Sequence, residues 1–341
     1  MRTQPSLCNL PDVVLRNIFN EVGFKSIINL RKVCRDLRNR IDYIKPEANL
    51  LSFGIRVNDN RIRLTYLGII TTDVEKGERR FRDEIMYEKT MKSGRSAVRC
   101  NRSKKKIVND DFMELALRHL QLILKFQKKN RKAVSFTNRT EYSNNFLRFL
   151  EMLKGFLAIE NQLLKVDHFR INTNDQKSVI PALSLIDPQS IDSISITGEN
   201  KKMLPMKFSE IVEMDHWKSA KSFSSNYKVT GVSAHNFCHF FGVNVTFKSI
   251  SVEELLECKK IFENSTEHVF FQITYDTFED REQFCEEMGP AVMIYEHLEW
   301  YFRMSTTDND VLLIRLSHPI RTIMFEREAV AYLPERAVIR D

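Results

Sequence analysis

The sequence predicts a chain of mixed α+β and α/β class, in which three short N-terminal helices precede a solenoid of strand–helix units closed by an antiparallel C-terminal cap. Three observations predict this fold: apolar residues at helical spacing in the first 48 residues, a strand–helix pattern that recurs after residue 128, and alternating strands after residue 277. At 341 residues the chain exceeds the usual size of one domain. We therefore divide it into residues 1–48, 49–127 and 128–341.

The first 48 residues carry an apolar stripe of helical period, made of Val14, Leu15, Ile18, Phe19 and Val22. Pro11 suits a first helical turn, where its missing N–H costs nothing. Gly23 ends the stripe, and further helices are expected over residues 26–33 and 34–44. Because so short a segment forms a poor core on its own, it is either completed by a partner's surface or packed as a cap on the rest of the chain. The sequence leaves both interpretations open.

Residues 49–127 are expected to connect this group to the repeats. Alternating apolar and polar residues predict strands over 51–57 and 62–67, around a turn at 58–60. A polar loop or weak strand is expected over 88–107, and apolar spacing predicts a helix over 109–126.

Positive charge is concentrated in one internal segment. The chain has a formal charge of +7, but residues 88–139 carry +11 and residues 140–341 carry −9. The basic segment suits a solvated loop and helix end, a nuclear import signal, or a patch for RNA or an acidic partner. Because most of the chain is acidic, we do not expect nucleic acid to be the main partner.

A strand–helix pattern recurs between residues 128 and 277. From Phe169 onward, short strands with an apolar-x-apolar core begin at intervals of 25, 29, 22 and 26 residues, at Ile194, Phe223, Val245 and Phe271. Helical patterns lie between the strands, over 145–160, 179–186, 208–220, 233–241 and 252–262. Units of this length fit a leucine-rich-repeat-like solenoid, and a three-layer α/β sandwich is the alternative. The repeat is degenerate, since Ser225 stands where an apolar residue is expected.

The pattern changes after residue 277. A helix over 277–288 ends at Gly289 and Pro290, and strands are expected over 298–304, 311–316 and 320–326. An antiparallel cap of this kind would protect the open edge of the solenoid.

The sequence gives little support to catalysis, metal binding or a cofactor. It contains no P-loop, G-x-S-x-G or G-x-G-x-x-G motif, and no two of its 6 cysteines form a C-x-x-C pair. His235, Cys238 and His239 come nearest to a metal cluster, but zinc needs three or four ligands, and a core helix explains these residues better. We expect a protein without enzyme activity, metal or cofactor.

No signal segment or membrane span is expected. Residues 1–10 lack an apolar core, and the longest uncharged stretch, residues 229–247, is interrupted by polar side chains. We therefore expect a reduced, soluble protein of the cytoplasm, the nucleus or both.

Two parts of the sequence carry a resemblance to a known family. Leu10-Pro11-Asp12-Val13-Val14-Leu15, followed by Leu30-Arg31-Lys32-Val33-Cys34-Arg35-Asp36-Leu37-Arg38, resembles an F-box. The step from Trp217 through Lys221 to Phe223, and the helix start at Ser251, are similar to parts of an FTH domain. Together they resemble the nematode F-box A family, with the F-box at 1–48 and the FTH domain at 128–341.

The resemblance implies a substrate-recognition subunit of an SCF-type (Skp–cullin–F-box) ubiquitin ligase. Such a protein binds a Skp adaptor of the cullin–RING ligase through its F-box and holds a target protein on its C-terminal domain. An apolar helical group also suits docking in a partner's groove. We expect the adaptor contact at Leu10, Pro11, Leu15, Ile18, Phe19, Ile27, Leu30 and Val33.

The target is expected to bind one face of the predicted sheet. The residue between the two apolar positions of each strand points away from the core. These residues are Arg170, Ser195, Ser224, Thr246 and Gln272. Solvated strand positions would show the same pattern, and two other functions stay open: a scaffold that recruits no ligase, and nucleic-acid binding by the basic segment.

Overall fold

The computed structural model describes residues 7–22, 24–47, 49–71, 78–90, 95–101, 106–127, 131–141, 143–199 and 205–340. The chain forms two compact units. Unit 1 comprises Met1–Ile171 with Ser184–Ile186, and unit 2 comprises Asn172–Leu183 with Asp187–Asp341. The three segments expected from the sequence divide the chain at other positions, and they stay a prediction.

Unit 1 begins with helices, as the sequence predicts: the 3-10 helix η1 (Leu7–Asn9), α1 (Asp12–Glu21), α2 (Phe24–Leu30) and α3 (Arg35–Ile44). Pro11 lies just before α1. The thiol of Cys34 caps α3 by accepting a hydrogen bond from the amide of Leu37 at 3.4 Å. The last turn of α3 ends at Lys45, which adopts a left-handed conformation.

A mixed sheet follows in unit 1. Its strands are β1 (Leu50–Asn58), β2 (Arg61–Thr71), β3 (Glu78–Lys89), β4 (Ser96–Cys100), β5 (Lys106–Val108), β6 (Arg131–Arg139) and β7 (Val166–Asn172). Antiparallel pairing runs from β5 through β4, β3 and β2 to β1, and β6 joins β1 in parallel. The predicted strands 51–57 and 62–67 correspond to β1 and β2. We predicted no strand at β3, and only a loop or weak strand over 88–107, where β4 and most of β5 lie.

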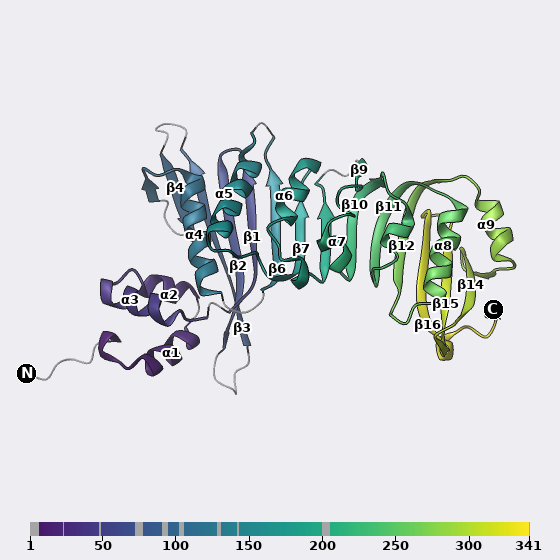
Figure 1. Ribbon diagram of the computed structural model, residues 1–341, viewed down its shortest axis with the longest axis horizontal. Coiled ribbons are helices and arrows are strands. Elements are labelled where there is room, and N and C mark those ends of the chain that lie inside the picture. The colour runs from purple at the N-terminus through teal and green to yellow at the C-terminus, as the bar shows by residue number, and fades with distance from the viewer. Residues whose placement is uncertain are drawn as a thin grey trace, which may run out of the picture. The chain divides into compact units, whose positions relative to one another are not determined.

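Two helices pack on one face of this sheet (Figure 1): α4 (Phe112–Phe126) against β2 and β3, and α5 (Asn145–Ile159) against β1. Asp111 caps α4 by accepting from the amide of Met113 at 2.8 Å. His119 of α4 lies between the rings of Tyr66 and Tyr87. Burial lowers the pKa of His119 to about 4, so the ring is neutral at pH 7 and packs as a core residue.

Unit 2 contains parallel strands that continue into an antiparallel region. Its strands are β8 (Ser193–Thr197), β9 (Pro205–Lys207), β10 (Ser222–Thr230), β11 (Gly242–Ile250), β12 (Phe270–Phe278), β13 (Val292–Ile294), β14 (His297–Met304), β15 (Thr307–Ser317), β16 (Thr322–Ala329) and β17 (Ile339–Arg340). β8 and β9 both pair with β10 in parallel, and β11 and β12 follow in parallel. β12 then pairs antiparallel with β16, which leads through β15 to β14.

Apart from the helix predicted over 252–262, the helices that the sequence predicts in unit 2 are shorter in the structure. The helices of unit 2 are η2 (Gln176–Ser178), α6 (Val179–Leu183), η3 (Pro188–Ser190), α7 (Asp215–Ser219), η4 (Ala234–Phe237), α8 (Val252–Glu263), α9 (Arg281–Met288) and η5 (Val330–Tyr332). The helix predicted over 208–220 is a series of turns followed by α7, and the helix predicted over 233–241 is the 3-10 helix η4. Apolar residues three positions apart fit both an α-helix and a 3-10 helix. The pattern therefore predicted too many helical residues in both places.

An aromatic cluster forms part of the core of unit 2. The Trp217 ring lies 4.7 Å from that of Phe223, 5.0 Å from that of Phe237 and 4.8 Å from that of Phe240, between ring centroids. The Trp217 indole donates to the carbonyl of Asn236 at 3.1 Å, so its polar group is satisfied.

Within the part of the chain that the structure describes, no helix is long and apolar enough to cross a membrane.

Candidate functional site

Charged side chains around Asp42 connect the N-terminal helices to the rest of unit 1. Arg31 donates from Nε and Nη2 to the two carboxylate oxygens of Asp42, at 2.7 and 2.8 Å. Lys125 of α4 lies 3.6 Å from the same carboxylate. The hydrogen bond from Arg31 holds the pKa of Asp42 below its ordinary value, so the carboxylate is charged at pH 7. The two hydrogen bonds from Arg31 connect the segment that follows α2 to α3. The contact with Lys125 connects both to α4.

Apolar contacts close the inner side of these helices. Phe24 of α2 meets Tyr66 of β2 edge to face, with ring centroids 5.7 Å apart, and its ring lies 6.5 Å from that of Phe126 of α4. Lys25 adds an ion pair of 3.4 Å with the buried Asp83 of β3. The helices therefore pack on one side as a cap on their own chain, which was one of the two interpretations left open.

Arg40 of α3 positions the segment that precedes α1. Its guanidinium donates to the carbonyl of Leu10 at 2.6 Å and lies 3.3 Å from the carboxylate of Asp12. Leu10 is half-buried and Pro11 is exposed. This contact holds the Leu-Pro pair at the surface in a defined position.

The eight residues predicted for the adaptor contact differ in their burial. Three are fully buried and hold the helices together: Leu15, Phe19 and Ile27. Three are half-buried: Leu10, Ile18 and Leu30. Pro11 and Val33 are exposed, Val33 by 70%. A partner can contact the three half-buried and two exposed residues directly, but it can contact the three buried residues only if the helices separate.

The sequence analysis missed three apolar side chains on the outside of these helices. Val13 is 73% exposed, Val14 is 41% exposed and Tyr43 is 78% exposed. Val14 was placed in the apolar stripe but not among the contact residues. On α1, Leu15 and Phe19 are four positions apart and face inward, so the neighbouring valines turn outward. The spacing of the buried residues on α1 was the signal in the sequence that could have identified the two valines.

Comparison with protein families identifies both parts of the chain. Residues 7–47 match the F-box domain, and residues 147–285 match the FTH domain. It is an F-box protein with an FTH domain. F-box domains generally bind the Skp adaptor of cullin–RING ligases, and F-box proteins are generally non-catalytic adaptors. No curated protein and no solved structure matches the chain.

Within the FTH domain, polar residues of neighbouring strands form a row. Ser195 of β8 pairs with Ser224 of β10, Ser224 with Asn244 of β11, and Asn244 with Gln272 of β12. The Ser224 hydroxyl donates to that of Ser195 at 3.1 Å. The register thus brings three of the predicted target-binding residues together and adds Asn244, which the sequence analysis did not select.

The other two predicted residues lie outside this row. Thr246 lies two residues further along β11 than Asn244, pairs with Lys228 and Thr274, and is only 5% exposed. Arg170 is exposed on β7 of unit 1. The sequence analysis aligned Val245 with Phe223, whereas the register aligns Val243 with Phe223 and Phe271. The slip of two residues moved the selected position from Asn244 to Thr246.

An irregularity in β10 explains the polar residue at position 225. Between Ser224 and Lys228 the register to β11 shifts, so that four steps on β10 match two steps on β11. The buried Ser225 hydroxyl accepts from the amide of Tyr227 at 3.1 Å, and the Tyr227 hydroxyl donates to the carbonyl of Thr173. Ser225 therefore satisfies an amide at a bulge.

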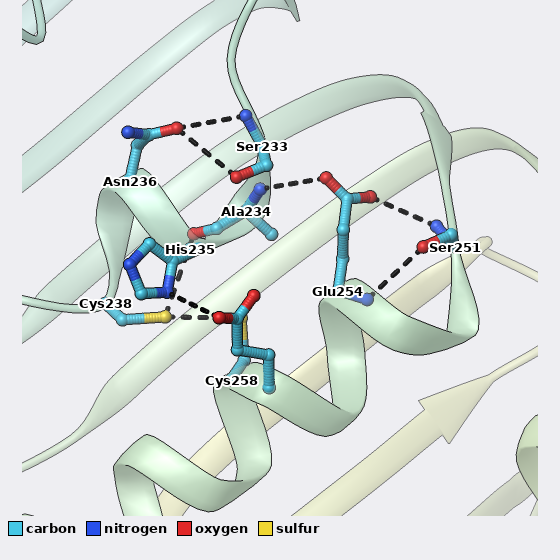
Figure 2. A network of polar contacts seen from close by, with 9 residues as sticks. Ser233, Ala234, His235, Asn236, Cys238, Ser251, Glu254 and Cys258 are labelled. Carbon is cyan, nitrogen blue, oxygen red and sulfur yellow. Dashed lines mark hydrogen bonds and ion pairs between the residues drawn. The ribbon is translucent and has the colours of Figure 1, made fainter.

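Figure 2 shows the polar network that joins η4 to α8. Ser251 and Glu254 form a capping box at the start of α8, and a carboxylate oxygen of Glu254 also accepts from the amide of Ala234 at 3.3 Å. Cys238 donates to the sulfur of Cys258 at 3.2 Å. One side chain, Glu254, thus links two consecutive strand–helix units.

The same region contains the residues considered as metal ligands. His235 lies 3.4 Å from a carboxylate oxygen of Glu257, and His239 contacts the carbonyl of Trp217 at 2.9 Å. His235 and His239 thus contact different groups. Among the described residues no group of three His, Cys, Asp or Glu side chains could hold a metal ion.

The basic segment is described only in part. Lys92, Arg102, Lys104, Lys105, Lys128 and Lys129 lie outside the described residues. Arg95, Arg99 and Lys106 are exposed next to or within β4 and β5.

Proposed function

We propose that this protein is the substrate-recognition subunit of an SCF-type ubiquitin ligase, with its F-box on the Skp adaptor and a target protein on its C-terminal domain. The observation that carries the proposal is the match of residues 7–47 to the F-box domain. In this role the chain supplies no chemistry, because it only holds a target so that the ligase's conjugating enzyme reaches a lysine. The two domains together also support our proposal that the chain belongs to the nematode F-box A family and works in the cytoplasm, the nucleus or both.

The adaptor surface that we propose consists of the exposed and half-buried apolar residues of the F-box. Pro11, Val13 and Val14 lie at the start of α1, beside the Leu10 carbonyl that Arg40 holds. Val33 lies in the turn between α2 and α3. Full burial of such a side chain contributes about 1.5–3 kcal/mol, so a few of them suffice for a stable contact.

The proposal is tested by titrating the purified chain with a Skp adaptor. Leu10→Ala with Pro11→Ala, and separately Val33→Asp, should weaken adaptor binding by at least about tenfold, or 1.4 kcal/mol. Val338→Asp is the matched control, because Val338 is a similarly exposed valine in unit 2, at 61% against 70% for Val33. Equal adaptor affinity of all these variants, or no binding by the parent chain, would refute the assignment and favour a scaffold that recruits no ligase.

We further propose that the row Ser195, Ser224, Asn244 and Gln272 contacts the target. The parallel pairing of β8, β10, β11 and β12 supports the leucine-rich-repeat-like arrangement on which this rests. Affinity purification under proteasome inhibition, with the parent chain and with Asn244→Arg/Gln272→Arg, should show loss of target proteins while the adaptor is retained. An unchanged set of captured proteins would contradict this assignment.

A further inference from the structure

The sheet of unit 1 carries arginines on the face opposite α4 and α5. Ile55, Val57 and Leu64 are buried toward the helices, so the residues that alternate with them along the strands point to the other side. We call this side the arginine face; its charged residues include Arg56, Arg61, Arg63, Glu84, Glu88 and Arg99.

The register sets like charges beside one another on the arginine face. Arg56 of β1 pairs directly with Arg63 of β2, Arg63 pairs with Met86 of β3, and Met86 pairs with Arg99 of β4. Like charges directly opposite each other on neighbouring strands are destabilising. An anion above the row would convert this repulsion into attraction.

Carboxylates of the arginine face pair with Arg61 and Arg63 but do not satisfy all of their donors. Arg61 donates to Glu88 at 2.6 Å, and Arg63 lies 3.4 Å from a carboxylate oxygen of Glu84. Among the residues that the structure describes, the Nε atoms of Arg61 and Arg63 are nevertheless buried without a hydrogen-bond acceptor. Buried polar groups normally have partners, so Arg61 and Arg63 each retain a donor that the carboxylates of this face do not satisfy.

A pocket lies at the same place. It has a volume of about 160 Å³ and is lined by Arg61, Met86, Glu88, Ala97 and Arg99. Met86 and Ala97 make part of its lining apolar, and Arg61, Glu88 and Arg99 make the rest charged. The pocket therefore suits a short chain segment in which an apolar side chain is flanked by acidic ones.

We propose that the arginine face binds a carboxylate-rich segment of a partner protein. Arginine pairs with carboxylates in a planar, two-point geometry, and Arg61 and Arg63 already pair with carboxylates. Nucleic acid fits less well, because bases are usually stacked on aromatic rings. The registers of the described parts of β1, β2, β3, β4 and β6 place no aromatic side chain on this face. This binding does not depend on the F-box or on adaptor recruitment.

Fluorescence anisotropy of a labelled Glu-Glu-Leu-Glu-Glu peptide with the full chain tests the proposal. The matched probes are Gln-Gln-Leu-Gln-Gln and a five-nucleotide single-stranded DNA. We expect the acidic peptide to bind at least about tenfold more tightly than the glutamine peptide, with affinity that falls as salt rises.

Two variants of opposite effect locate the binding site. Arg63→Ala/Arg99→Ala should weaken the acidic peptide at least about tenfold, whereas Arg148→Ala, an exposed arginine on α5, should leave it unchanged. Glu88→Gln releases Arg61 and should tighten binding about twofold or more, which keeps the test valid if the double variant unfolds. Equal binding of both peptides, no response to these variants, or tighter binding of the DNA would overturn the proposal.

Discussion

The F-box and the C-terminal unit bury their apolar side chains in different ways. The F-box helices depend on other elements: Phe24 packs on Tyr66 and Phe126, and Asp42 is held in part by Lys125 of α4. In unit 2, by contrast, the rings closest to Trp217 come from Phe223, Phe237 and Phe240, which are near to it in the sequence.

The difference shows which region is open to a partner. A helical group that is completed on one side only keeps exposed apolar residues on the other, as Val13 and Val33 do at 73% and 70% exposure. Exposed apolar patches are typical of interaction sites. The cluster around Trp217 is buried within unit 2, so the sheet beside it can present neutral polar residues to a partner.

Trp217→Ala should have the largest effect on stability, and the effect should be confined to unit 2. Removing a fully packed tryptophan costs about 3–5 kcal/mol of the free energy of unfolding, all of it in unit 2. Phe241→Ala is the control, because Phe241 is 36% exposed and its loss should cost much less. Calorimetry checks the stability, and adaptor binding below the unfolding temperature should persist; its loss would show that the two regions do not fold separately.

Phe24→Ala should destabilise the other region, the F-box. The expected cost is about 3 kcal/mol, because the ring loses its contacts with Tyr66 and Phe126. If the F-box folds against the chain, saturating adaptor should restore part of the lost stability, since a ligand stabilises the state that it binds. Tyr43→Ala, at an exposed position of α3, is the control for thermal unfolding with and without adaptor, and an equal effect of both variants would contradict the role given to Phe24.

Asp42→Asn should have the smallest effect, and it depends on pH. The pKa of Asp42 is lowered in the folded state, so its contribution is present above the unfolded value of about 4 and is lost as pH falls through the folded value. At pH 7 the variant should lose about 1 kcal/mol of unfolding free energy, and the difference from the parent should shrink below about pH 4. Urea unfolding at several pH values measures this, with Asp36→Asn, an exposed position on α3, as control; a difference independent of pH would exclude the ion pair as its cause.

Regular periodicity made much of the fold predictable. The helix predicted over 109–126 corresponds to α4, and the capping residues Ser251 and Glu254 located the start of α8. β3 was missed because two of its residues interrupt the alternation that predicts a strand. The charged Asp83 lies on the buried face with Ile85 and Tyr87, and the apolar Met86 lies on the outer face.

The candidate site was harder to predict, because burial depends on contacts between distant residues. Leu15 and Phe19 look like surface candidates until β2 and α4 are seen to cover the F-box on one side. The shift from Asn244 to Thr246 arose because Val243, Val245 and Phe247 all alternate with polar residues, so local spacing does not tell which of them pairs with Phe223. Pairing register and packing therefore decide the site residues, while local pattern decides the elements.

The two tryptophans of the chain, Trp217 and Trp300, are both buried in unit 2. Intrinsic indole emission therefore reports on that unit alone and is silent about the F-box. An unfolding curve followed at the tryptophan wavelength would miss separation of the N-terminal helices, whereas far-ultraviolet circular dichroism would include it. Disagreement between the two spectroscopic signals would be a direct measure of how independently the two ends of this protein melt.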